Sequence, residues 1–303
     1  MSEEFKDKFE SEKFNPEESS VAVKSSIKSS PIAMTLIALG TVFVLYQFFG
    51  AGLTFLLFGG LSEGNVQGFR FMTMLSQFLF IFVPTLFFAK WQEVNYSEIF
   101  KLKTPRLFEI LLAIVGTLSL QSIAQVYLYV QDMLFPIQKL SPIFETLRKM
   151  MERTYSILIS AKSPLEFIFV AIVVALTPAI CEELLFRGLV QYNLSKASNY
   201  KLGFIITGVI FAMYHANPFS FIPLIALGVY FGYLVYKSGS IFLAMTAHFV
   251  NNFTAAYFYY AFGREGIVQG SAGSMFMVGF FSIAVFVSSI YAFEILYANK
   301  NQI

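Results

Sequence analysis

Residues 165–193 read LEFIFVAIVVALTPAICEELLFRGLVQYN, an apolar stretch that is interrupted in its second half by Glu182, Glu183 and Arg187. A helix needs about 20 predominantly apolar residues to cross a bilayer, so the stretch predicts a transmembrane helix. Charged side chains are rare in such helices because each costs about 2.5–3.5 kcal/mol at the middle of the bilayer. Three of them in one span indicate a functional site or a buried ion pair.

The composition of the whole chain is that of a membrane protein. Hydrophobic residues make up 56% of its 303 residues and charged residues only 13%, whereas soluble domains contain about 25% charged residues. The net charge is +2 without a basic cluster, so nothing indicates a nucleic-acid partner. Cys181 is the only cysteine, which excludes an intrachain disulfide and a cysteine-based zinc cluster.

The apolar stretches predict an all-α fold, a polytopic integral membrane helical bundle of about eight transmembrane helices with a buried polar cavity. The expected spans lie near residues 32–59, 69–90, 107–131, 165–193, 203–217, 219–237, 240–262 and 273–297. Asn217-Pro218 alone separates the fifth span from the sixth, so one or both are expected to be short or partly re-entrant. Residues 1–30 read as a polar, mobile tail without the layout of a signal peptide, and residues 31–303 as a single membrane domain.

The distribution of Lys and Arg favours an orientation with both termini inside. With the N-terminus inside, the inner segments hold thirteen of these residues and the outer segments seven. Five of those seven lie in the long connection 132–164, which also has a helical apolar stripe. Its pattern predicts a helix that lies on the membrane surface or covers the bundle.

Three pairs of residues are spaced by one helical turn and so share a helix face: Glu183-x-x-x-Arg187, Phe211-x-x-x-His215 and His248-x-x-x-Asn252. Glu183 and Arg187 are expected to form an ion pair that neutralises both charges. Glu182 points about 100° away from Glu183 on the helix and has no partner nearby in the sequence. His215 and His248 are the only histidines of the chain, and both lie in apolar stretches.

The depths of these side chains are similar. Measured along the helices from the predicted inner turns, Glu182 and His215 lie roughly 20–25 Å deep, His248 roughly 15 Å and Asn252 roughly 20 Å. We therefore expect the four side chains to converge on one buried, wet cavity. Pro178, four residues before Glu182, is expected to kink the fourth span and open space there.

Such a set of side chains is sufficient to activate water for hydrolysis. An apolar cavity disfavours an ionised carboxylate, which suits Glu182 to act as a general base near neutral pH. His215 can share or relay the proton, and His248 and Asn252 offer two N–H donors for an oxyanion. Phe211 is expected to shape the cavity, and Glu183 and Arg187 to support it.

The order Glu-Glu-x-x-x-Arg, Phe-x-x-x-His and His-x-x-x-Asn resembles the CAAX prenyl protease and bacteriocin-processing family (CPBP, also called Abi) of intramembrane proteases. The resemblance covers roughly residues 165–260, which would form the catalytic core. It implies an eight-span fold and hydrolysis of peptide bonds in prenylated CAAX-type, bacteriocin-like or pheromone-like peptides. By the same resemblance Glu182 and His215 would activate the water, and His248 and Asn252 would form the oxyanion site. Its prokaryotic branch favours a bacterial cytoplasmic membrane.

Alternative interpretations remain open at this point. Glu182, His215 and His248 would make a three-ligand zinc site, although a metal-free mechanism is favoured because the His-Glu-x-x-His helix of common zinc proteases is absent. Intramembrane Glu and His side chains are also found in the proton relays of transporters. A non-catalytic immunity or scaffold protein could use the same fold to bind a hydrophobic or lipidated peptide.

Overall fold

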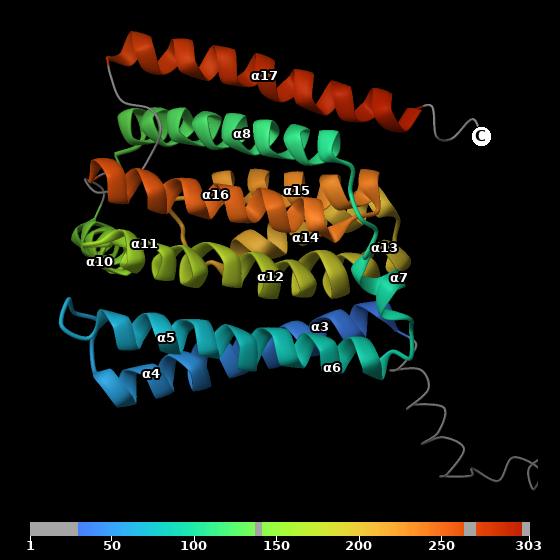
Figure 1. Ribbon diagram of the computed structural model, residues 1–303, viewed down its shortest axis with the longest axis horizontal. Helices are drawn as coiled ribbons and strands as arrows, with labels where there is room; N and C mark the ends of the chain where they lie inside the picture. Colours follow the sequence, from blue (N-terminus) through green and yellow to red (C-terminus); the bar gives the residue numbers. More distant parts are fainter. Residues whose placement is uncertain (1–29, 137–140, 264–270, 299–303) are drawn as a thin grey trace, which may run out of the picture.

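The computed structural model describes residues 30–136, 141–263 and 271–298, which form a bundle of helices (Figure 1). The helices, with their π-helical segments labelled η, are α3 (Pro31–Phe43), η1 (Val44–Gly50), α4 (Ala51–Phe58), α5 (Val66–Gln77), η2 (Phe78–Phe82), α6 (Val83–Trp91), α7 (Tyr96–Phe100), α8 (Leu107–Leu134), α10 (Pro142–Ile159), α11 (Pro164–Ala171), η3 (Ile172–Leu176), α12 (Thr177–Glu183), η4 (Leu184–Val190), α13 (Gln191–Ala197), α14 (Tyr200–Tyr214), α15 (Phe221–Ser238), α16 (Ile241–Phe262) and α17 (Ala272–Ala298). The described part of the chain has no β-strand apart from one isolated bridge, between Leu102 and Ser240. The predicted tail, residues 1–30, lies outside the described residues except for Ser30.

The all-α, multi-pass membrane fold expected from the sequence is confirmed. Six helices are long and apolar enough to cross a membrane, namely Pro31–Phe58, Val66–Trp91, Leu107–Leu134, Pro164–Ala197, Phe221–Ser238 and Ala272–Ala298. The predicted fifth span is the shorter apolar helix α14, which ends at Tyr214. The predicted seventh span is α16, which has 22 residues but is more polar because it carries His248, Asn251 and Asn252.

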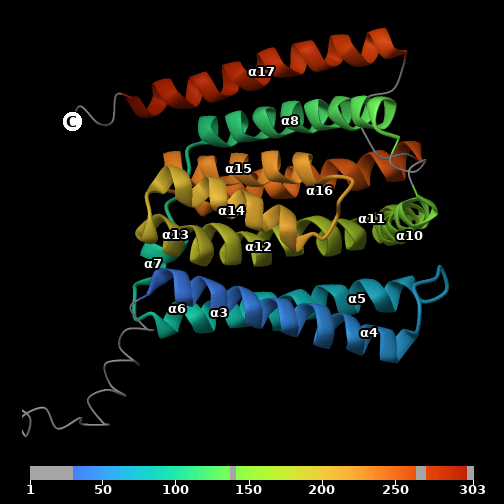
Figure 2. The same cartoon turned by 180° about the vertical axis from the view of Figure 1, so that it is seen from behind.

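The helices are stacked in layers that run side by side. Both views show α3, α4, α5 and α6 along one side of α12 and α13, with α8 and then α17 on the opposite side (Figures 1 and 2). The first layer packs on the motif helix through a buried cluster that includes Leu39, Ile81, Leu185 and Phe186. The start of α3 and the end of α17 lie at the same end of the bundle (Figure 1). Which end faces the inside of the cell stays a prediction.

Three helices begin at a Ser-Pro pair, which the sequence uses as a start signal. The serine hydroxyl accepts a hydrogen bond from a backbone N–H of the first turn, and proline fits the first helical position because its missing N–H would have had no partner there. The bonds run from Ala33 N to Ser30 Oγ (3.3 Å), from Ile143 N to Ser141 Oγ (3.3 Å) and from Glu166 N to Ser163 Oγ (3.2 Å). Two of these starts, at Ser141 and Ser163, lie in the long connection between α8 and α11.

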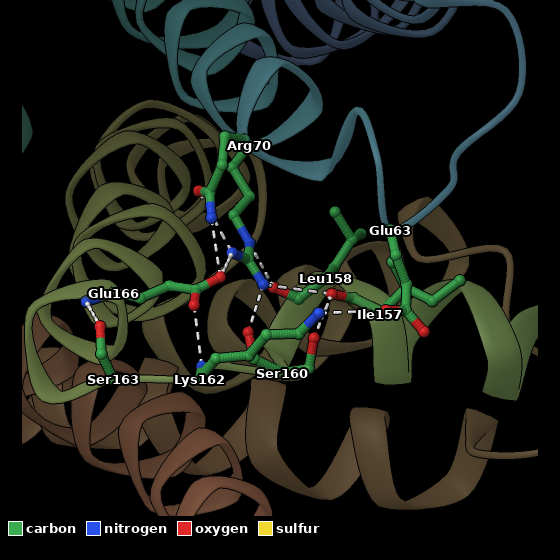
Figure 3. A network of polar contacts seen from close by, with 9 residues as sticks. Glu63, Arg70, Ile157, Leu158, Ser160, Lys162, Ser163 and Glu166 are labelled. Atoms are coloured by element: carbon green, nitrogen blue, oxygen red, sulfur yellow. Dashed lines mark hydrogen bonds and ion pairs between the residues drawn. The ribbon is translucent and has the colours of Figure 1, made fainter.

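That connection contains the predicted amphipathic helix, α10, which lies across one end of the bundle (Figure 1). Arg70 of α5 holds the end of α10 in place and is fully buried. Its guanidinium donates hydrogen bonds to the backbone oxygens of Leu158 (2.9 Å), Ile157 (3.2 Å) and Ser160, and pairs with Glu166 at 2.7 Å (Figure 3). One side chain therefore joins α5, α10 and α11.

Replacing Arg70 by alanine should lower the free energy of unfolding by about 3 kcal/mol, because it removes the cation paired with Glu166 and leaves the last carbonyls of α10 without a donor. Arg70→Lys should recover only part of the loss, since one ammonium group cannot reach all of the guanidinium's acceptors. Thermal unfolding in detergent measures the effect, with Arg153→Ala on the exposed face of α10 as the control. An Arg70→Ala protein as stable as this control would contradict the assigned role.

Candidate active site

The residues of the Glu-Glu-x-x-x-Arg motif lie where α12 continues into the π-helical segment η4. Wide π turns inside α-helices occur frequently at functional sites. The two adjacent glutamates face different surroundings. Glu183 is fully buried, whereas Glu182 lines a pocket. The structure therefore separates the two carboxylates, as their 100° offset on the helix predicts.

Glu183 is the centre of a buried polar cluster. Its Oε1 accepts hydrogen bonds from Arg187 Nη1 at 2.9 Å and from His248 Nδ1 at 2.7 Å. The ion pair expected between Glu183 and Arg187 is present, and both side chains are shielded from solvent. Arg187 also donates to the backbone oxygen of Gly228 at 3.2 Å, and its guanidinium lies 4.3 Å from the ring centre of Phe211. The cluster therefore links the helices that carry the three motifs, namely α12 with η4, α14 and α16.

Glu182 and His215 share a pocket of about 220 Å³. His215 Nδ1 donates to the backbone oxygen of Phe211 at 2.8 Å, because a carbonyl can only accept. This bond leaves Nε2 free, 4.0 Å from Glu182 Oε2. The same carboxylate oxygen is buried and has no hydrogen-bond partner. Two acceptor atoms at this separation can both receive a hydrogen bond from one water molecule.

Both walls of this pocket come from helices far apart in the sequence. Its lining residues are Val42, Phe43, Tyr46, Gln47, Ile81, Glu182, Leu185, Phe186, Tyr214 and His215. Phe43 and Gln47 are exposed at the side of the bundle, so the pocket opens between the first layer and the motif helix. Tyr46, Gln47 and the neighbouring Gln77 were not expected from the sequence as site residues. The signal that could have found them is the presence of polar side chains within apolar spans.

His248 and Asn252 do not line this pocket, so the expected convergence of all four side chains on one cavity is incomplete. His248 packs its ring on Phe231, with centres 5.5 Å apart, and bonds Glu183. Asn252 Nδ2 donates to the backbone oxygen of Val174 at 3.0 Å, and its Oδ1 accepts from Asn251. His248 therefore belongs to the cluster around Glu183, and Asn252 bonds the motif helix at Val174.

The bond from Asn252 to Val174 follows from the position of Pro178. Val174 precedes Pro178 by four residues, and proline has no N–H to donate to that carbonyl. Asn252 supplies the missing donor from α16. The carbonyl that Pro178 leaves without its usual helical donor is therefore bonded by a side-chain amide of a neighbouring helix.

Asn252→Ala should destabilise the protein by about 1–3 kcal/mol, because the Val174 carbonyl loses its donor in a buried place. Adding Pro178→Ala should restore part of that stability, since alanine supplies a backbone N–H near the same carbonyl. The measurement is thermal unfolding of the two single variants and the double variant. Strictly additive losses in the double variant would show that the two residues are not coupled through Val174.

The geometry does not bring the three alternative zinc ligands together. Among the residues that the structure describes, no three His, Cys, Asp or Glu side chains are grouped so that they could hold a metal ion. Glu182 and His215 are neighbours, but His248 is directed to Glu183 instead. The three side chains therefore do not form one ligand set.

The fold and the site define a multi-pass helical membrane protein with glutamate and histidine side chains enclosed between its helices. Residues 164–254 match a protein-family model described as type II CAAX prenyl endopeptidase Rce1-like. The match supports the CAAX prenyl protease family that the motifs suggested and, in general terms, a CAAX-type intramembrane endopeptidase. A search of curated proteins and a search of solved structures each found no match.

Proposed function

We propose that this protein hydrolyses a peptide bond of a hydrophobic or lipidated peptide with a water molecule activated by Glu182 and His215. The observation that carries the proposal is the shared pocket, in which Glu182 Oε2 and His215 Nε2 lie 4.0 Å apart. The proposed substrates are prenylated CAAX-type, bacteriocin-like or pheromone-like peptides. The family match supports this class of substrate in general.

The reaction would begin with a water molecule held by both acceptors. As its oxygen forms a bond to the carbonyl carbon, a proton moves from the water to Glu182 and the carbonyl electrons move to the oxygen. The oxyanion then reforms the carbonyl, the C–N bond breaks and the proton passes to the leaving amine. His215 orients the water through Nε2, because its Nδ1 is fixed by the Phe211 carbonyl.

The sequence assigns His248 and Asn252 to the oxyanion site, but neither side chain lines the pocket of Glu182 and His215, so we propose that they position the motif helix. His248 Nδ1 donates to Glu183 at 2.7 Å, which fixes the orientation of the imidazole ring. Asn252 uses one of its two amide protons for Val174 and keeps the other. Arg187 balances the charge of Glu183, so the cluster can remain buried.

The test is mass spectrometry of a pool of hydrophobic and prenylated peptides incubated with the purified protein or with Glu182→Gln, which keeps the shape of the side chain. Products that form only with the wild-type protein would support the proposal, and their termini would define the cleavage rule. Products from both proteins would refute the role of Glu182. If neither cleaves while both retain the same peptides, a binding protein without catalysis is favoured.

A further inference from the structure

The pocket that holds Glu182 and His215 has a second polar wall, formed by the first membrane helix. Besides Glu182 and His215, the polar residues that line the pocket are Tyr46 and Gln47 of the first membrane helix and Tyr214 of α14. The hydroxyl of Tyr214 donates to the backbone oxygen of Leu39 and is therefore engaged within the protein. Tyr46 and Gln47 remain as the groups on this wall that could meet a substrate.

Tyr46 lines the same pocket as Glu182 and His215. Its phenol lies close to the Glu182 carboxylate and to the side chain of Gln77 on α5. The oxygen of the Gln77 amide is buried and has no hydrogen-bond partner. A phenol carries one proton that it can donate into the pocket.

A local feature of the backbone places this residue. Tyr46 lies in the π-helical segment η1, and its carbonyl accepts from the N–H of Ala51, five residues later. This wider turn changes the direction of Tyr46 relative to an uninterrupted α-helix, and such turns are frequent at functional sites. Ser76 of α5 packs closely against Gly50 at the end of η1, which brings Gln77 next to the same turn.

We propose that Tyr46 is a further catalytic residue, which donates its hydroxyl proton in a hydrogen bond to the carbonyl oxygen of the scissile peptide. This inference rests on the proposed function. The water at Glu182 and His215 attacks the carbonyl carbon from one wall, and the oxygen that becomes negative points to the opposite wall. Tyr46 retains its proton throughout, so the atoms and electrons balance as in the hydrolysis above. A donor that faces the developing charge stabilises the transition state more than the substrate.

The test compares Tyr46→Phe with a matched control. Loss of one oxyanion donor typically lowers kcat by about 10²–10³-fold, and we expect that loss with little change in KM. The control is Tyr192→Phe, which removes a hydroxyl bonded to Glu98 (2.8 Å) outside this pocket, and its kcat should stay within twofold of wild type. Peptide binding is measured separately in the Glu182→Gln background, where Tyr46→Phe should leave affinity unchanged.

A second variant separates catalysis from packing. Gln77→Leu keeps the Tyr46 hydroxyl but removes the amide beside it, and it should lower kcat less than Tyr46→Phe does. Equal losses in both variants, or a loss of affinity equal to the loss of kcat, would overturn the catalytic assignment. So would Tyr46→Phe with kcat within threefold of wild type. Absence of cleavage by the wild-type protein would overturn the proposed function as well, whereas active wild type with active Tyr46→Phe overturns this inference alone.

Discussion

An Arg187→Ala variant should accumulate poorly and lose about 3–5 kcal/mol of stability, because it leaves the carboxylate of Glu183 buried without its cation. Both side chains of the pair are fully shielded from solvent, so water cannot replace the guanidinium. The backbone oxygen of Gly228 would also lose its donor. Protein level in membranes and thermal unfolding in detergent measure the effect.

The matched control is the double variant Glu183→Gln with Arg187→Ala. A neutral amide at position 183 removes the stranded charge and still offers an oxygen to His248, so the double variant should be more stable than Arg187→Ala alone. Normal accumulation of Arg187→Ala would contradict the structural role of the pair. If such a protein also lost activity, Arg187 would have to act in the reaction instead.

His215→Ala should reduce kcat by about 10²–10⁴-fold while it leaves the unfolding temperature nearly unchanged. The side chain of His215 is 32% exposed and hydrogen-bonds Phe211 of the preceding helical turn, so little packing is lost. Purified protein and a peptide found to be cleaved by the wild type provide the rate. A large drop in the unfolding temperature would instead show that His215 holds the fold together.

Glu182→Gln should reduce kcat to a similar extent, and the double variant should be scarcely slower than either single variant. The two side chains are proposed to hold one water molecule, and residues that act as a unit give non-additive losses. Losses that multiply in the double variant would show that Glu182 and His215 act in separate steps.

The sequence predicted the membrane helices and the Glu183–Arg187 pair because both depend on local spacing. Six of the apolar stretches are long enough to identify a span without knowledge of their neighbours. The sequence also predicted that Glu182 and His215 lie at a similar depth, because they are almost equally far along the chain from the short turn between α13 and α14. The structure places them in one pocket.

Depth gives no information on the direction in which a side chain points, and here the sequence was insufficient. It could not show that His248 bonds Glu183 instead of facing Glu182, since that depends on the rotation of α16 against α12. It also could not show that Tyr46 faces the site, because the contact joins residues more than 130 positions apart and depends on a π-helical turn.

The exposed positions of Phe43 and Gln47 at the mouth of the pocket have a consequence for kinetics. If the proposed function holds, a pocket that opens at the side of the membrane bundle would receive its substrate by diffusion in the plane of the bilayer. The reaction rate would then depend on the mole fraction of peptide in the lipid and not on its concentration in bulk water. Addition of inert lipid at constant total peptide would slow the enzyme by surface dilution.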